Sequence, residues 1–456
     1  MQNYELDDVA KEYISKMAED VKSRCSIDKN AFKSLNVKRG LRNVDGTGVL
    51  AGVTAIGSVQ GYMMLDGDPV PMPGRLYYRG IEINEIIENH VKRNMFGFEE
   101  VCYLLLMGKL PNSDELEQFK LALAHARHMP GGYFDAVLFK SPSRSIMNKL
   151  SCDVLSMYSF DDNPDDVSIE NVLRQSIELI ARIPIIVANA YNVNRHVFDN
   201  ESLYLHVPKD DISTAENLLR MLRPDKKYTE DEAHLLDIAL TLHAEHGGGN
   251  NSTFTCRSLS STQTDTYSAI SGAINALKGP LHGGANAKVV QMVENIRANV
   301  ANVESDTELR DYLNLILDGK ANDGSKKIYG LGHAVYTESD PRAVTLKKYA
   351  GEMAEKTDRG EEFHLVERIE KNAIDILTTE KNLSMPICAN IDLYSGFVYS
   401  MLRIPEDLYT PLFAAARISG WCAHRIEEVM TGNRIMRPAY RSAVRNVPYV
   451  GMDERD

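Results

Sequence analysis

Three histidines of this sequence stand beside glycines where helices are predicted to end. They are His246 in HAEHGGGNNS, His282 in KGPLHGGAN and His333 in YGLGHAVYTESDPR. Glycine lets a helix end sharply and lets the backbone approach a ligand closely, so such a histidine can point into space that another group occupies. Each one by itself is more simply interpreted as a helix cap or a buried polar group. The three together favour a site for acid/base chemistry.

A carboxylate that could act with them comes later in the chain. Asp392, in ANIDLYSGFVYSML, stands at the start of an apolar helical run, after a loop expected at 379–387. By itself it is best interpreted as an acid that stabilises a helix N-terminus, an effect of about 1 kcal/mol. The functional alternative is a general base, because a carboxylate held by helix N-terminal amides could take a proton from a carbon next to a thioester carbonyl.

The HxxH pair of His243 and His246 offers a different chemistry. Helical spacing places both imidazoles on one face, as a zinc site requires. A third ligand is missing nearby, since Glu245 points to another side of the helix and the sequence has no HExxH motif. We therefore expect no metal site.

The six cysteines, at positions 25, 102, 152, 256, 388 and 422, are scattered without a CxxC pair. This pattern lacks the spacing of a metal site. We expect buried free thiols in a reducing compartment.

Helices must position these residues, because helical periodicity dominates the sequence. Apolar residues recur at three- and four-residue spacing in the segments 98–110, 113–129, 168–191, 230–246, 266–279, 285–300, 361–379 and 411–430. Strand signals are confined to 48–80, where β-branched and aromatic runs are separated by Gly, Pro and Asp, as in short hairpins. Further loops are expected at 129–133, 206–212 and 320–330. The sequence therefore predicts an all-α protein with a minor N-terminal β element.

The bulk properties exclude several classes of protein. The chain has 456 residues, enough for two or more packed units with a cleft between them. Its formal net charge of -13 is spread along the sequence without a block of Lys and Arg, which argues against a nucleic-acid binder. No apolar run is long enough to predict a membrane-spanning helix. The acidic N-terminus resembles neither a secretory signal nor a transit peptide, which favours a cytoplasmic protein.

In these motifs the chain resembles the citrate synthase family, over nearly its whole length. RGLRNVDGTGVLAGVTAIG, YYRGIEINEI and FEEVCYLLLMGKLP are similar to the family's N-terminal region. HAEHGGGNNSTF, GPLHGGAN, GLGHAVYTESDPR, NIDLYSG, AARISGW and NRIMRP then follow in the family's order. GPLHGGAN together with GHAV and DPR is a specific signal, whereas YRG or GGGN alone would be a weak one.

The resemblance implies an acyltransferase of the tricarboxylic acid cycle that condenses acetyl-CoA with oxaloacetate and water to citrate and CoA. His282 matches the family histidine that hydrogen-bonds the thioester oxygen and stabilises the enol or enolate, and it should be neutral in that role. His333 matches the histidine that protonates the oxo-acid carbonyl, and Asp392 matches the carboxylate that removes the methyl proton. No cofactor is implied, because acetyl-CoA is a co-substrate.

The two carboxylates of oxaloacetate need charged hydrogen-bonding partners when they leave water. The positions that match the family's oxo-acid contacts are His246, Arg342, Arg417 and Arg437, with Ser252 as the residue that orients the enol-stabilising histidine and Phe413 as an aromatic beside the substrates. In the family the arginine of the RP motif reaches into the partner subunit's site. The resemblance therefore implies a homodimer in which Arg437 does so.

The loop 328–333, IYGLGH, corresponds to the family's cradle for the CoA adenine, formed by the backbone of Tyr329, Gly330, Leu331 and Gly332. Two departures bear on CoA binding. YTES follows GHAV where the family often has a basic residue that meets a CoA phosphate. TTEKNLSMPICANID also lacks the family's usual PNVD form before the catalytic carboxylate. Together they predict that CoA is held differently or more weakly.

The resemblance further implies a large helical domain of residues 1–283 plus 394–456 and a small helical domain of 284–393, whose closure would bring the catalytic residues together. Two alternatives stay open. A 2-methylcitrate synthase would use propionyl-CoA, which differs from acetyl-CoA by one methylene and is discriminated by only about 1–3 kcal/mol. A non-catalytic relative would keep the fold and bind metabolites without turnover.

Overall fold

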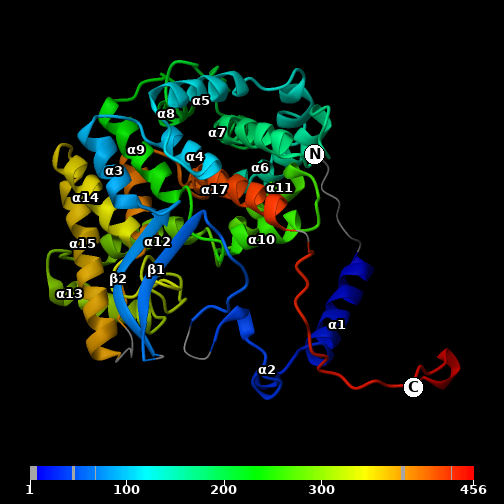
Figure 1. The fold of residues 1–456 in the computed structure, drawn as a ribbon. Coiled ribbons are helices and arrows are strands. Elements are labelled where there is room, and N and C mark those ends of the chain that lie inside the picture. The colour runs from blue at the N-terminus through cyan, green and yellow to red at the C-terminus, as the bar shows by residue number, and fades with distance from the viewer. Residues whose placement is uncertain (1–7, 44–46, 67, 382–385, 433, 456) are drawn as a thin grey trace. The chain divides into compact units, whose positions relative to one another are not determined.

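A computed structural model describes residues 8–43, 47–66, 68–381, 386–432 and 434–455. The chain forms two compact units, residues 52–436 and a smaller unit in which 1–51 associates with 437–456. Figure 1 shows the elements of both. The division into 1–283 plus 394–456 and 284–393 stays a prediction.

The described part of the smaller unit contains α1 (Asp8–Arg24), α2 (Lys29–Ser34) and two single 3-10 turns, Arg39–Leu41 and Met452–Glu454. Helix α2 begins after Asp28 because the carboxylate of Asp28 accepts a hydrogen bond from the amide of Asn30 at 2.9 Å. Arg437, which the resemblance assigns to the oxo-acid site, belongs to this unit.

The larger unit is helical throughout apart from one small sheet, which confirms the predicted all-α class. Its helices are α3 (Ile83–Lys92), α4 (Phe98–Met107), α5 (Ser113–Ala126), α6 (Ile146–Ser156), α7 (Ile169–Asp199), α8 (Thr214–Leu222), α9 (Glu230–His243), α10 (Asn251–Ser260), α11 (Thr266–Lys278), α12 (Ala285–Asn299), α13 (Asp306–Leu317), α14 (Pro341–Glu355), α15 (Gly360–Asp375), α16 (Ile391–Met401) and α17 (Tyr409–Thr431).

All segments predicted to be helical contain a helix, and polar caps fix several of their starts. Asn112, Ser213 and Thr229 each accept from the amide three residues on, and the glutamate at that position bonds back to the cap. The loop predicted at 379–387 begins inside a π-helical turn, Ile376–Glu380, and residues 382–385 of it lie outside the described residues.

The predicted helix 230–246 ends earlier, at His243. The hydroxyl of Tyr78 lies between the groups that would continue the helix. It accepts from the amide of Glu245 at 3.2 Å and lies 3.0 Å from the carbonyl oxygen of Thr241, to which it can donate. Because the tyrosine replaces the direct amide-to-carbonyl bond, the chain leaves the helix and His246 becomes a loop residue.

Helix α17 forms the centre of the larger unit. It packs against α4, α6, α7, α9, α10 and α11, and nearly every residue from Tyr409 to Ile426 is buried. Figure 1 shows it, in orange-red, crossing among these helices. A helix that is buried on all sides must satisfy its polar side chains internally or with a ligand. Arg417, His424 and Arg425 are such side chains.

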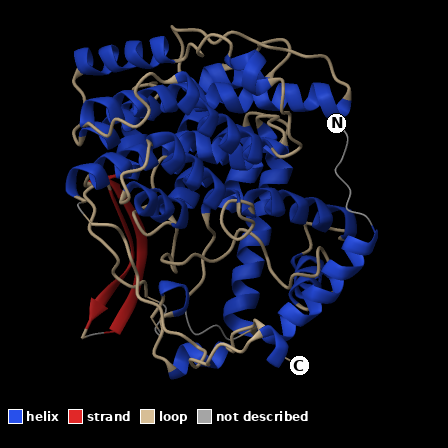
Figure 2. Cartoon of the chain, turned by 90° about the vertical axis from the view of Figure 1, so that its right-hand side faces the viewer, coloured by secondary structure: helices blue, strands red, loops and turns tan. Residues whose placement is uncertain are grey.

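The two long strands lie in the predicted β region, 48–80, and a short third strand follows it. β1 (Gly57–Leu65), β2 (Asp68–Tyr78) and β3 (Ile81–Glu82) form an antiparallel sheet in the order β1-β2-β3. Figure 2 shows the two long strands at one edge of the helical body. The amide of Gly74 donates to the carbonyl oxygen of Ser339 at 3.1 Å, so β2 is attached to the segment that precedes α14.

Two sequence expectations about the chain as a whole can be compared with the structure. No helix in the described part of the chain is long and apolar enough to span a membrane. The cysteines are free thiols, but only Cys102, Cys256, Cys388 and Cys422 are buried. The expectation of burial is wrong for Cys25 and Cys152, which are exposed.

Candidate active site

The rings of His246, His333 and Tyr336 form one cluster. The centroid of His246 lies 5.0 Å from that of His333 in an edge-to-face arrangement, and Tyr336 stacks on His333 at 4.6 Å. The third pair of the cluster is His246 and Tyr336, whose ring centroids are 5.6 Å apart. The structure therefore brings together one predicted catalytic histidine and one predicted substrate-binding histidine.

The backbone fixes the tautomer of His333. Its Nδ1 accepts from the amides of Val335 and Tyr336, each at 3.1 Å. Because an amide N–H can only donate, Nδ1 carries no proton, and the hydrogen of the neutral ring is on Nε2. This is the form of imidazole that can give a proton to a carbonyl oxygen.

Tyr336 is a site residue that sequence reasoning missed. Besides its contacts with the two histidines, its ring lies 5.8 Å from the guanidinium carbon of Arg342. Its hydroxyl is buried without a hydrogen-bond partner, and burial raises its pKa. The available signal was an aromatic three residues after His333, inside the YTES segment that was considered only for CoA.

Arg342 lies in the first turn of α14, where Asp340 caps the helix. One carboxylate oxygen of Asp340 accepts from the amide of Arg342 at 3.0 Å. The guanidinium of Arg342 then donates to the same carboxylate through Nε at 3.0 Å and Nη2 at 2.7 Å. The arginine is thus held in one orientation by its own helix cap.

Arg417 presents unmet hydrogen-bond donors. It is 0% exposed, its Nε donates to the carbonyl oxygen of His243 at 2.6 Å, and its guanidinium carbon lies 4.7 Å from the ring centre of Phe413. Both of its Nη atoms are buried without a hydrogen-bond partner, as is Nε2 of His246. Burial lowers the pKa of Arg417 to about 10, so the side chain stays charged at neutral pH. Buried donors without acceptors are costly, which indicates a site for an anionic ligand.

His282 is supported by the start of α10. Its Nε2 lies 3.1 Å from Oδ1 of Asn250, 3.2 Å from Oγ of Ser252 and 3.4 Å from the amide of Ser252. Trp421 of α17 donates its indole N–H to the same Ser252 oxygen at 3.2 Å. Burial, with a contribution from the charge of Arg417, lowers the pKa of His282 to about 4. The ring is therefore neutral at pH 7, as its predicted role requires.

Asp392 is joined to His333 by the backbone. Gly332 donates to the carbonyl of Cys388 at 2.8 Å, and Asn390 donates to that of Gly330 at 2.9 Å, which forms an antiparallel bridge. The side chain of Asn390 caps α16 by accepting from the amide of Asp392 at 3.0 Å. Burial raises the pKa of Asp392 to about 6, against the opposing effect of Arg342. A carboxylate with this pKa is mostly ionised at pH 7 and more basic than an exposed one.

The predicted CoA loop is packed against the base of α16. The backbone of Leu331 bridges to Ala389, and Tyr329 donates its hydroxyl to Asp323 at 2.6 Å. Gly330 has φ +84°, and a Cβ there would lie 2.8 Å from Cβ of Leu393. Only glycine fits this conformation and this contact. The loop is therefore firmly placed beside the site.

The imidazole of His243 contacts protein groups through Nδ1 and its ring, and its Nε2 is buried without a hydrogen-bond partner. Its Nδ1 lies 2.7 Å from the carbonyl oxygen of Ala239, and its ring meets that of Phe413 edge to face at 4.7 Å. Burial lowers its pKa to about 3. Among the described residues, no group of three or more His, Cys, Asp or Glu side chains is arranged to hold a metal ion.

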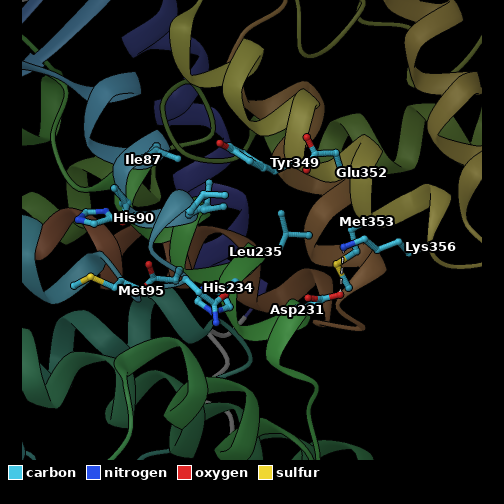
Figure 3. Close-up of a pocket in the computed structure, with 15 residues that line it drawn as sticks. Ile87, His90, Met95, Asp231, His234, Leu235, Tyr349, Glu352, Met353 and Lys356 are labelled. Carbon is cyan, nitrogen blue, oxygen red and sulfur yellow. Dashed lines mark ion pairs between the residues drawn. The ribbon is translucent and has the colours of Figure 1, made fainter.

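Arg437, one of the predicted oxo-acid contacts, belongs to the smaller unit. A separate cavity of about 150 Å³ lies among α3, α9 and α14 and is drawn in Figure 3, with the ion pair of Asp231 and Lys356 near one end. None of the predicted site residues lines it.

Known proteins are similar to most of this chain. Residues 42–439 match the family described as citrate synthase, C-terminal domain. A citrate synthase of Deinococcus radiodurans is 37% identical over 383 residues, which cover 84% of this chain and 93% of that protein. The 2-methylcitrate synthase 1 of Corynebacterium glutamicum is 31% identical over 425 residues, which cover 92% of this chain and 97% of that protein.

A solved structure is also similar. It is the citrate synthase of the thermophilic archaeon Thermoplasma acidophilum in a ternary complex with carboxymethyl coenzyme A and oxaloacetate. Its TM-score with this chain is 0.74 at 26% identity, and the match covers 92% of this chain and 99% of that one.

Proposed function

The chain belongs to the citrate synthase family, and we propose that its site condenses acetyl-CoA with oxaloacetate and water to give citrate and CoA. It is an acyltransferase that converts the acyl group into an alkyl group on transfer. The observation that carries the assignment of the site is the pair of unmet Nη donors of Arg417 together with the unpaired ring nitrogen of His246, which contacts a histidine whose proton is fixed on Nε2. A dianionic oxo acid supplies the missing acceptors and places its carbonyl near that proton.

In the first step Asp392 removes a proton from the methyl carbon of acetyl-CoA, while neutral His282 donates a hydrogen bond to the thioester oxygen. The enol carbon then attacks the keto carbon of oxaloacetate. His333 gives its Nε2 proton to the keto oxygen as that oxygen becomes a hydroxyl. Water then attacks the thioester carbonyl and gives a proton back to His333, while Asp392 gives its proton to the leaving CoA sulfur, which releases citrate and CoA.

Binding of the substrates follows the matched positions. Arg342 and Arg417, with His246, hold the carboxylates of the oxo acid, while Phe413 packs beside it and Ser252 orients His282. The backbone of Tyr329, Gly330, Leu331 and Gly332 receives the CoA adenine. No cofactor is needed, because the acid and base groups of the chain carry every proton transfer.

A thiol-release assay with acetyl-CoA and oxaloacetate tests this function. We expect CoA to appear only when both substrates are present. Well-folded protein that releases no CoA would instead support the non-catalytic alternative.

The similarity to a 2-methylcitrate synthase over 92% of this chain favours a second candidate substrate, propionyl-CoA. One methylene changes binding by about 1–3 kcal/mol, so the two activities differ in degree. Comparing kcat/KM for acetyl-CoA and propionyl-CoA on one preparation decides between them. A higher kcat/KM for propionyl-CoA would reassign the enzyme as a 2-methylcitrate synthase.

We further propose a cytoplasmic homodimer in which Arg437 completes the partner's site. Arg437→Ala and Asp392→Asn dimers should each be nearly inactive. After subunit exchange, about half of the dimers are mixed and each has one intact site, so activity should return to about a quarter of the parent's. Activity that does not return after verified exchange would place Arg437 in its own subunit's site.

We propose that residues 284–393 close over the bound oxo acid, which would exclude water before the enol forms. Small-angle scattering with and without oxaloacetate tests this motion. A decrease in the radius of gyration is expected, and unchanged profiles at saturating oxaloacetate would count against closure.

A further inference from the structure

A chain of buried charged groups lies behind the oxo-acid site. Glu245 and His424 are both fully buried, and Nε2 of His424 lies 2.9 Å from Oε1 of Glu245. On the other side of the imidazole, Nη1 of Arg257 lies 3.0 Å from Nδ1. The three side chains thus form a continuous line through the core.

The proton positions in this line are determined by chemistry. A guanidinium has donors and no acceptor, so Nδ1 of His424 must accept from Arg257. The hydrogen of the imidazole is then on Nε2, where it is donated to Glu245. Arg257 is held in turn by Glu427 at 2.6 Å and Glu428 at 2.9 Å. Every link therefore has one donor and one acceptor.

Each end of the line touches a segment that carries a substrate-binding residue. Glu245 directly precedes His246, and its Oε1 accepts from the amide of Gly247 at 2.5 Å. Its other oxygen lies 2.4 Å from where a Cβ on Gly420 would be, so α17 can approach this closely only with glycine there. Arg417 is one turn before Gly420 on the same helix.

The far end of the line connects to the supports of His282, the residue proposed to contact the thioester. Arg257 is on α10, whose first turn carries Ser252, and Ser252 contacts His282. The line therefore joins three elements: the segment after α9 with His246, α17 with Arg417, and α10 with the support of His282. Loss of the link to Glu245 would let the segment that carries His246 shift against α17, whereas loss of the link to Arg257 would free only α10, which supports His282.

We propose that Glu245, His424 and Arg257 form a positioning relay that holds His246 and Arg417 in the geometry that binds the oxo acid. The relay rests on the proposed function, because it acts on the residues assigned to oxaloacetate. None of its three members is assigned a contact with substrate. They are positioning residues that act through their neighbours.

Two substitutions of His424 separate the two links. His424→Gln places an amide nitrogen near the position of Nε2, so it keeps the bond to Glu245 and loses the acceptor for Arg257. His424→Asn places its oxygen near the position of Nδ1, so it keeps Arg257 and loses Glu245. We expect the Kd for oxaloacetate to stay within about threefold of the parent in H424Q and to rise about tenfold or more in H424N.

The split between binding and turnover distinguishes positioning from general damage. In H424N the KM for oxaloacetate should rise with Kd, while kcat at saturation stays within about threefold of the parent. General damage would lower kcat and the melting temperature together in both variants. Equal Kd values in H424Q and H424N would overturn the relay.

A matched control comes from another buried ion pair. Lys149 and Asp153 of α6 are both buried, with 2.7 Å between Nζ and Oδ1, and Lys149 also donates to the carbonyl oxygen of Val137 and to Ser141, neither of which is a site residue. Asp153→Asn should lower the melting temperature and leave the Kd for oxaloacetate unchanged. A Kd change in D153N as large as in H424N would also overturn the relay.

Binding is measured by titration calorimetry, so the test does not depend on turnover. Parent protein that binds no oxaloacetate would contradict the proposed function itself. Parent protein that binds oxaloacetate, with no difference between the two His424 variants, would contradict the relay alone.

Discussion

The candidate active site has an oxo-acid half, with His246, His333, Arg342 and Arg417, and a thioester half, with His282 and Asp392. The two halves differ in how they are prepared for substrate. In the oxo-acid half, Arg417 is 0% and Tyr336 1% exposed, and several of the buried polar atoms have no partner within the protein. In the thioester half, Leu281 is 96% exposed, while its neighbour His282 already has polar partners. One half gains free energy by receiving an acceptor. The other half gains free energy only when bound substrate and protein residues cover the exposed surface at Leu281.

This difference assigns affinity and chemistry to different residues. Substitutions among the unmet donors should change the binding of the oxo acid, because ligand acceptors replace missing partners there. Substitutions at His282, its supports and Asp392 should change turnover and leave oxo-acid binding nearly intact. The following predictions test that separation, from the largest effect to the smallest.

Asp392→Asn should have the largest effect. The amide cannot accept the methyl proton, so kcat should fall by about 10³-fold. The Kd for oxaloacetate, measured by calorimetry, should stay within about threefold. In the parent, a pKa of about 6 predicts that kcat decreases as the pH falls below 6, because the base becomes protonated. Near-normal turnover in the variant would remove Asp392 from the mechanism.

Arg417→Met should have the largest effect on binding. Loss of the guanidinium removes both unmet Nη donors, and we expect the Kd for oxaloacetate to rise by about 10²-fold. The melting temperature of the free protein should not fall in proportion, because a buried charge with unmet donors is removed at the same time. An unchanged Kd would mean that the unmet donors of Arg417 do not bind the oxo acid.

His282 should make stability depend on pH. The pKa of the folded state, about 4, lies below the ordinary 6.5 of the unfolded chain. The unfolded state therefore binds the proton first, and stability is full above pH 6.5 and is lost as the pH falls towards 4. At pH 5 this group should cost about 2 kcal/mol of unfolding free energy. Urea unfolding of His282→Gln should show a pH dependence between 7 and 5 that is smaller by that amount.

Ser252→Ala should have the smallest effect. It removes the hydroxyl that contacts His282 and accepts from Trp421, which costs about 1 kcal/mol. We expect kcat to fall about fivefold at unchanged Kd for oxaloacetate. A change in Kd larger than the change in kcat would show that the two halves are coupled through Trp421.

Local sequence patterns predicted the β region and the longer apolar helices, because each depends on periodicity and caps within a few residues. The predicted helices are α4, α5, α7, α9, α11, α12, α15, α17 and the start of α16. The end of α9 was predicted too late, since Tyr78 intercepts its last hydrogen bond from a strand 163 residues away in the sequence. Periodicity contains no information about such a contact.

The site shows the same limit. The histidines and Asp392 stand in recognisable motifs, but Glu245 and His424 are 179 residues apart, and each by itself is an ordinary helix-associated side chain. The attachment of β2 to the segment before α14 spans 265 residues. Partners at such separations are identified only once the fold brings them together.

The backbone bridge between Leu331 and Ala389 has an evolutionary consequence. It closes the intervening chain into a loop whose two ends carry the proposed acid and base, so their spacing depends on two peptide hydrogen bonds and not on the length of the chain between them. Tyr336 and Arg342 lie within this loop, so the freedom to vary is confined to its segments without site residues. A chain that lacks the PNVD form expected from the resemblance can therefore still hold Asp392 in register with His333.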